Sequence, residues 1–226
     1  MLTRVYLVRH GETEWSVSGR HTGRTEVPLT VVGEDEGREL GARLRGIPFG
    51  RVQTSPRQRA VRTCQLAGFG PVAEVDPDLA EWDYGDYEGQ LSVDIHGTRP
   101  DWNLFRDGCP GGESPAQVTD RADRVIARLR LLQGEIAVFS HGHFGRVLGV
   151  RWIGLSVRHA QSLLLRTASL SILSYDHGRA DQPAIGLWNE VKSEIVGSES
   201  RSRVADATMK ARAIERWENE GGEISR

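Results

Sequence analysis

Two segments of this sequence place cationic and imidazole side chains next to glycine. Arg9-His10-Gly11 follows the apolar run Val5-Tyr6-Leu7-Val8, and Ser140-His141-Gly142-His143 follows the run Ile136-Ala137-Val138-Phe139. The forked guanidinium of Arg9 suits phosphate oxygens. A ring nitrogen of His10 can act as a nucleophile near neutral pH. These residue types indicate a site that binds a small anion and reacts through histidine.

The two apolar runs predict buried strands that end at these motifs. The carboxyl ends of parallel strands open onto the same edge of a sheet. Adjacent strands lie about 5 Å apart, so we expect His10 and His141 to flank one small anion. A lone histidine is more often a core or helix-cap residue. Two strand-end histidines, each followed by glycine, weaken that alternative.

A second source of positive charge follows the predicted strand Arg51–Thr54. Ser55-Pro56 predicts the start of a helix with proline at its first position, ending near Gly68. Arg57 and Arg59 would lie in its first turns, where the helix N-terminus itself attracts anions. Residues two apart point to different faces, so at most one of these arginines points inward. The alternative is a solvated basic face.

Glu81 is the candidate proton donor. It lies in the predicted loop 79–89, next to Trp82 and close to Tyr84. Aromatic neighbours exclude water from a carboxyl group, which raises its pKa and lets it act as a general acid. The alternative is an ordinary surface glutamate, which fits Glu88 better than Glu81.

The remaining elements predict the scaffold. Further strands are expected at residues 71–75, 168–175 and 184–188, and further helices after Thr30, from Ser114 to Gly134 and after His143. Strands that alternate with helices indicate an α/β fold with three layers. Residues 193–203 are polar and predict a linker. Residues 204–226 have a charged helical pattern, so we expect a catalytic domain at 1–192, a linker and a tail.

The composition excludes several classes of protein. The 226 residues have 38% hydrophobic and 27% charged side chains and a formal net charge of −2, so no general nucleic-acid-binding surface is expected. Cys64 and Cys109 lie far apart, which argues against a zinc site or a disulfide framework. No segment has the pattern of a signal peptide or a membrane span. A cytoplasmic location is therefore expected.

Four segments occur in a fixed order: Arg9–Thr13, Thr54–Ala60, Glu81–Gly85 and Ser140–His143. Together they resemble the histidine phosphatase superfamily, also called the phosphoglycerate mutase-like family. The resemblance covers about residues 2 to 190. It implies a three-layer α/β/α sandwich with a mainly parallel central sheet. The tail from Val204 lies outside this family pattern.

The resemblance also implies roles for individual residues. His10 would form a phosphohistidine through Nε2, and Glu81 would protonate the leaving group and then activate water. Arg9, Arg59 and His141 would surround the phosphoryl oxygens. All the cations would be side chains, so no metal and no cofactor is expected.

Longer strings indicate two branches of the family. Residues 14–16, 19–23 and 81–89 resemble the actinobacterial acid phosphatases and the fungal sedoheptulose 1,7-bisphosphatases. This resemblance implies that Thr22, Gly23, Tyr84 and Arg146 contact the rest of the substrate and that Ser16 touches the phosphate. Arg146 alone could equally be a surface arginine.

The leading hypothesis is a phosphomonoesterase that hydrolyses a small phosphorylated metabolite, either a sugar phosphate or a bisphosphate. The runner-up is a phosphoglycerate mutase. The mutases usually carry a longer insertion between the Glu81 loop and the strand that ends at the second histidine. The insertion is short here, which favours access of water to the phosphohistidine. A third hypothesis, a non-catalytic phospho-ligand or protein-binding module, would need neither a nucleophile nor an acid. A homodimer is implied by the resemblance alone.

Overall fold

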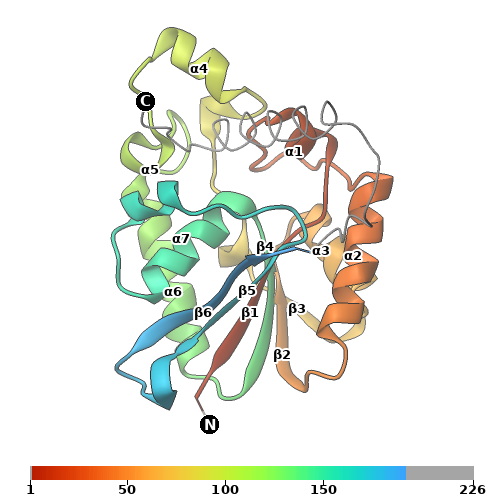
Figure 1. Cartoon of the computed structure of the whole chain (residues 1–226). Coiled ribbons are helices and arrows are strands. Elements are labelled where there is room, and N and C mark those ends of the chain that lie inside the picture. The colour runs from red at the N-terminus through yellow and green to blue at the C-terminus, as the bar shows by residue number, and fades with distance from the viewer. Residues whose placement is uncertain (1, 192–226) are drawn as a thin grey trace, which may run out of the picture.

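The computed structural model describes residues 2–191, and these build an α/β fold around one six-stranded sheet (Figure 1). The strands are β1 (Arg4–Arg9), β2 (Phe49–Thr54), β3 (Ala73–Val75), β4 (Glu135–Ser140), β5 (Leu170–Tyr175) and β6 (Pro183–Glu190), in the order β3-β2-β4-β1-β5-β6. β3, β2, β4 and β1 are parallel, whereas β5 is antiparallel to β1 and β6 is antiparallel to β5. The expected, mainly parallel sheet is confirmed.

Helices cover both faces of the sheet and make the three layers (Figure 1). The helices are α1 (Glu14–Ser18), α2 (Val31–Leu44), α3 (Gln58–Leu66), α4 (Ser92–Thr98), α5 (Leu104–Asp107), α6 (Pro115–Arg130) and α7 (Gly142–Trp152). α2 and α3 pack on one face, and α6 and α7 pack on the other. α1, α4 and α5 lie beyond the carboxyl ends of the strands.

The alternation of side chains along β1 explains why both faces are covered. Val5 and Leu7 belong to the hydrophobic cluster that includes the apolar faces of α6 and α7. Tyr6 and Val8 belong to the second cluster, with α2 and α3. Successive strand residues point to opposite faces, so a run that is apolar at every position must be buried on both sides.

The register of β1 against β4 sets the geometry of the site. Arg9 pairs with Ser140, and the backbone N–H of His10 donates to the carbonyl of Ser140 at 3.0 Å. The strands are parallel, so the residues that follow this last pair, His10 and His141, emerge side by side. The register thereby produces the proximity that the two motifs predict.

Helix boundaries differ from the prediction at α3, α6 and α7, the last of which begins at Gly142 rather than after His143. α3 begins at Gln58 with Arg57 as its N-cap, rather than at Pro56, because Ser55 still accepts the Arg57 N–H in a turn. α6 ends at Arg130, before Gly134, although its predicted start is correct. Ser114 caps that start in a reciprocal capping box with Gln117.

Gly11 is required by packing rather than by a ligand. A Cβ at Gly11 would lie 2.3 Å from the carbonyl oxygen of Gly33, and one at Gly33 would lie 2.1 Å from the carbonyl oxygen of Glu12. The chain that leaves β1 therefore crosses the first turn of α2 with backbone against backbone.

The predicted linker 193–203 and tail 204–226 lie outside the described residues. Between Leu2 and Val191, every helix is too short or too polar to cross a lipid bilayer.

Candidate active site

A cavity opens at the carboxyl ends of β1 and β4, with about 430 Å³ of space free of protein atoms. Its lining comes from the loop after β1, from α1, from the Glu81 loop and from the start of α7. The lining residues are Arg9, His10, Thr13, Trp15, Ser16, Gly19, Arg20, His21, Thr22, Glu81, Tyr84, Gly142 and His143.

His10 is held in one tautomer by its own neighbour. Its Nδ1 lies 2.7 Å from the carbonyl oxygen of Gly11, and a carbonyl only accepts, so Nδ1 carries the proton. Burial, followed by the charges of Arg59 and Arg9, lowers the pKa of His10 well below its usual value. The ring is therefore neutral at pH 7, and Nε2 carries the lone pair that a nucleophile needs.

His141 lies directly beside His10, with 5.2 Å between the ring centroids. It is fully buried, and its Nε2 lies 2.6 Å from the hydroxyl of Ser55. Its Nδ1 is buried and has no hydrogen-bond partner among the described residues. Burial, then the positive charge of Arg59, lowers the pKa of His141 well below its usual value.

Arg59 is the arginine of its pair that points inward. It is fully buried, and it donates from Nη1 to the carbonyl of Thr25 at 3.1 Å and from Nη2 to that of Thr22 at 2.8 Å. Arg57 is instead half-buried and pairs with Glu26. Arg59 is not among the residues that line the cavity, but its charge lowers the pKa of His10 and of His141. Among residues 2–191, no carboxylate forms an ion pair with it.

Arg9 is the second buried cation, at 6% exposure, and it donates from Nη1 to the carbonyl of Leu165. A Cβ at Gly142 would lie 3.2 Å from its guanidinium carbon. Glycine at the start of α7 thus lets the guanidinium lie against the backbone beside His141.

Glu81 is buried at 8% exposure and faces the start of α7. Its Oε1 accepts the N–H of Trp82 at 2.9 Å and of Phe144 at 2.7 Å, and its Oε2 accepts that of His143 at 3.1 Å. Burial raises the pKa of this carboxyl, and these three hydrogen bonds and Arg59 oppose part of that rise. A bound phosphate dianion would raise the pKa further by repulsion, which favours a protonated Glu81.

Polar aromatic side chains form another wall of the cavity. The Tyr84 hydroxyl lies 2.5 Å from Nδ1 of His143, and the ring of His21 packs on Tyr84 with centroids 4.7 Å apart. Burial raises the pKa of Tyr84 well above its usual value, so the phenol stays protonated. This wall can offer hydroxyl and imidazole groups to a polar leaving group.

The structure brings only some of the predicted substrate contacts to the cavity. Ser16, Thr22 and Tyr84 line it, whereas Gly23 and Arg146 are not among the lining residues. Gly23 donates its N–H to the Glu88 carboxylate. Arg146 is fully buried, so it is not a surface arginine. It lies over the Phe105 ring and donates to the carbonyls of Ala160 and Gln161.

The sequence alone assigns no role to several residues of the site. His21, His143 and Ser55 belong to the recognised motifs, but no spacing argument indicated that they face the site. Arg121 carried a signal that was missed, because it occupies a buried position on the apolar face of α6, between Val118 and Ala122. A buried arginine requires a partner, which here is Glu113.

The cysteines and the metal-binding side chains add no further site. Cys64 and Cys109 are free and buried, and burial raises the pKa of the Cys64 thiol to about 12. Across residues 2–191, no group of three or more His, Cys, Asp or Glu side chains could hold a metal ion.

Comparison with known proteins supplies independent information. The sequence model of the histidine phosphatase superfamily (branch 1) matches residues 5–190. An acid phosphatase of Mycobacterium tuberculosis is 43% identical over 189 residues, which is 81% of this chain and 92% of that protein. The sedoheptulose 1,7-bisphosphatase of Saccharomyces cerevisiae is 34% identical, again over 81% of this chain and 92% of the relative.

A solved structure has the same fold. The structure of the open reading frame Rv3214 from Mycobacterium tuberculosis superposes with a TM-score of 0.77 at 40% sequence identity, and it covers 83% of this chain and 97% of its own.

Proposed function

Because this chain belongs to the histidine phosphatase superfamily (branch 1), it is a phosphatase, and we propose that it hydrolyses a sugar phosphate or bisphosphate through a phosphohistidine at His10. The relatives named acid phosphatase and sedoheptulose 1,7-bisphosphatase match the two branches that the sequence motifs resemble, so that prediction is confirmed. The substrate class is inferred from the second of these names.

One observation carries the mechanism. The neutral ring of His10 has Nδ1 bound to Gly11 and lies 5.2 Å from the ring of His141, in a cavity that Glu81 also lines. The nucleophile, the Arg9 guanidinium and a carboxyl with a raised pKa therefore line one cavity. A module that only binds phosphate needs neither the nucleophile nor the acid.

In the first step, Nε2 of His10 attacks phosphorus and the bond from phosphorus to the leaving oxygen breaks. Glu81 donates its proton to that oxygen, so the alcohol leaves neutral and Glu81 becomes a carboxylate. Arg9, Arg59 and the ring of His141 stabilise the charge on the phosphoryl oxygens. The carbonyl of Gly11 stabilises the ring of His10, which becomes cationic as the phosphohistidine forms.

In the second step, the Glu81 carboxylate takes a proton from water as the water oxygen attacks phosphorus. The bond between phosphorus and Nε2 breaks, and its electron pair returns to the ring. Inorganic phosphate leaves, and both His10 and Glu81 recover their starting protonation states. No step requires a metal ion, so a metal-independent, acid-type phosphatase is part of the proposal.

The expected binding partner is also part of the proposal. A small phosphorylated metabolite is the expected partner, without nucleic acid or membrane. The cytoplasmic location, the homodimer and the division into domain, linker and tail stay predictions.

The direct test is phosphate release from a panel of esters, with EDTA present and without bisphosphoglycerate. The panel contains sedoheptulose 1,7-bisphosphate, fructose 1,6-bisphosphate, 3-phosphoglycerate and p-nitrophenyl phosphate. We expect fast release from a sugar phosphate and none from the His10→Ala variant. Slow release from all, with interconversion of 2- and 3-phosphoglycerate once bisphosphoglycerate is added, would indicate a mutase instead. Binding of phosphate without any turnover would indicate the binding module.

A further inference from the structure

Glu81 lies in a segment of irregular backbone, between the short 3₁₀ helices Pro77–Leu79 and Gly85–Tyr87. Such a segment has few internal hydrogen bonds, so the direction of its side chains depends on contacts with other elements. We propose that the ion pair between Glu113 and Arg121 is the positioning device that holds Glu81 in its donating geometry. This inference rests on the proposed role of Glu81 as the general acid.

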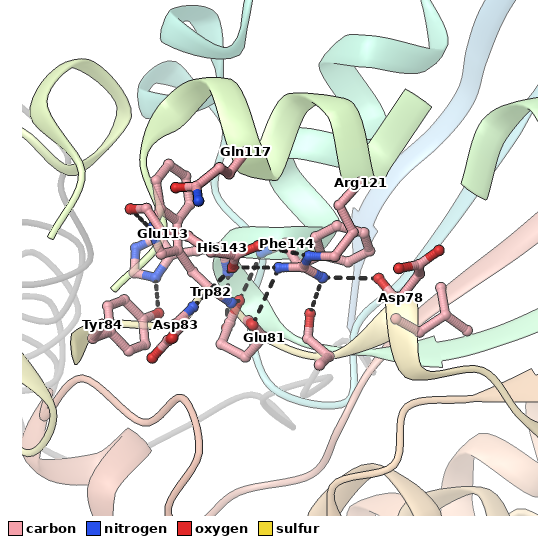
Figure 2. Close-up of polar contacts among 12 residues, drawn as sticks. Asp78, Glu81, Trp82, Asp83, Tyr84, Glu113, Gln117, Arg121, His143 and Phe144 are labelled. Carbon is pink, nitrogen blue, oxygen red and sulfur yellow. Dashed lines mark hydrogen bonds and ion pairs between the residues drawn. The ribbon is translucent and has the colours of Figure 1, made fainter. Parts of the chain in front are cut away.

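The guanidinium of Arg121 donates hydrogen bonds to this segment and to Glu113 (Figure 2). Nη1 donates to the carbonyls of Asp78 at 2.8 Å and Ala80 at 2.7 Å, and Nη2 donates to that of Glu81 at 3.3 Å. Nε and Nη2 donate to the two carboxylate oxygens of Glu113 at 2.8 and 2.7 Å. The five N–H groups of the fork are thereby all used, so the guanidinium has one orientation.

Glu113 holds the backbone on the other side of Glu81. Its Oε2 accepts the N–H of Asp83 at 3.0 Å, and its own N–H donates to the carbonyl of Asp83 at 2.8 Å. The carbonyl of Glu113 accepts the indole N–H of Trp82 at 3.0 Å. Arg121 thus secures the chain up to Glu81, and Glu113 secures the chain after it.

The same pair contacts the partner of the Glu81 carboxyl. The guanidinium carbon of Arg121 lies 4.2 Å from the centre of the Phe144 ring, and the N–H of Phe144 donates to Glu81 at 2.7 Å. Figure 2 draws Glu81 joined by dashed lines to Arg121 and to the residues at the start of α7. The loop and the helix that orient the carboxyl are therefore joined through one partly buried ion pair.

Stability alone would not require this arrangement. A partly buried ion pair contributes little net stability compared with apolar side chains of similar volume. Arg121 is 8% exposed on the apolar face of α6, where a leucine or methionine would also pack. Apolar side chains, however, cannot form hydrogen bonds with the backbone carbonyls and N–H groups on both sides of Glu81.

The experiment compares leaving groups. Arg121→Met and Glu113→Gln are assayed with p-nitrophenyl phosphate, whose leaving group needs little protonation, and with the alkyl phosphate of the panel that the wild type hydrolyses fastest. Glu81→Gln is the reference for loss of the acid. Arg151→Met is the control, because Arg151 on α7 makes a bidentate pair at 2.8 and 2.9 Å with Asp123 on α6, the helix that also carries Arg121.

We expect Arg121→Met and Glu113→Gln to lower kcat for the alkyl ester about tenfold more than kcat for the aryl ester, with KM changed by less than about threefold. Arg151→Met should change both esters equally. Equal losses with the two esters in Arg121→Met and Glu113→Gln would overturn the proposal, as would the same selectivity in Arg151→Met. If Arg121→Met does not fold, Glu113→Gln decides, because it keeps the backbone contacts of Glu113.

The Glu81→Gln variant distinguishes failure of the positioning role from failure of the proposed mechanism. If it discriminates between the esters and the Arg121 and Glu113 variants do not, only the positioning role fails. If Glu81→Gln itself treats both esters alike, Glu81 is not the acid, and the proposed mechanism and the positioning role fail together.

Discussion

Nε2 of His141 and the hydroxyl of Ser55 lie 2.6 Å apart, which joins the carboxyl end of β4 to the turn that follows β2. The Ser55 hydroxyl is fully buried, and Nε2 is the acceptor that its proton can reach among the hydrogen bonds of residues 2–191, so we expect it to donate to Nε2 while its oxygen accepts the N–H of Arg57 at 3.2 Å. The neutral ring of His141 then carries its proton on Nδ1, where it can donate to a phosphoryl oxygen.

Ser55→Ala should therefore lower kcat for p-nitrophenyl phosphate by about tenfold to a hundredfold, because the ring of His141 loses its fixed tautomer. Steady-state kinetics measures this. Ser169→Ala is the control, since Ser169 is also fully buried and donates to a backbone carbonyl, that of Arg166. Unchanged kinetics in Ser55→Ala would contradict the tautomer argument.

Arg59 should be indispensable, whereas its neighbour on α3, Arg62, should not. Arg59→Met removes the buried cation and the hydrogen bonds to Thr22 and Thr25, so kcat/KM should fall by about a hundredfold or more. Arg62 is exposed and pairs with Glu34, so Arg62→Met should leave kcat/KM within about twofold of wild type. Comparable losses in the two variants would show that general charge, not the buried position, matters.

The rate with alkyl esters should fall as pH rises above the pKa of Glu81. Burial raises that pKa, and the acid works only in its protonated form, so activity is present below the raised pKa and is lost above it. The pH dependence of kcat with an alkyl phosphate measures this. In Glu81→Gln this decline should disappear at a lower overall rate; a decline that persists would belong to another group.

Acid should destabilise the folded chain through His21, whose pKa burial lowers to about 4. Between about pH 6.5 and pH 4 the unfolded chain binds a proton at this residue, whereas the folded chain does not. The free energy of unfolding therefore decreases as the pH is lowered. At pH 5 the loss from His21 is about 2 kcal/mol relative to neutral pH. Urea unfolding of His21→Gln and wild type at pH 7.5 and 5 should show a smaller decrease in the variant. Equal decreases would contradict the lowered pKa.

Arg146 is an expected substrate contact whose side chain is buried away from the cavity lining. Its hydrogen bonds to Ala160 and Gln161 predict that Arg146→Met lowers the melting temperature while KM stays within about twofold of wild type. A large rise in KM without loss of stability would instead support the substrate contact that the family resemblance implies.

Most of the scaffold followed from residue order. The apolar runs before His10 and His141 predicted β1 and β4, and Ser114-Pro115 predicted the start of α6. The start of α3 was wrong, because the Ser55-Pro56 turn competes with the helix for the Arg57 N–H. Local capping chemistry is readable from sequence when, as in α6, both partners of the capping box lie within one turn.

Residue order and side-chain type alone predicted the proposed chemistry: a candidate histidine nucleophile, candidate phosphate-binding arginines, a second histidine and a candidate acid. Tertiary structure decided which atoms can act. The proton on Nδ1 of His10, the burial of Arg59 rather than Arg57, and the joining of Glu81 to Glu113 and Arg121 all depend on contacts between segments distant in the chain or on backbone direction. Tautomers, pKa values and side-chain directions are set by such surroundings, and one sequence does not display them.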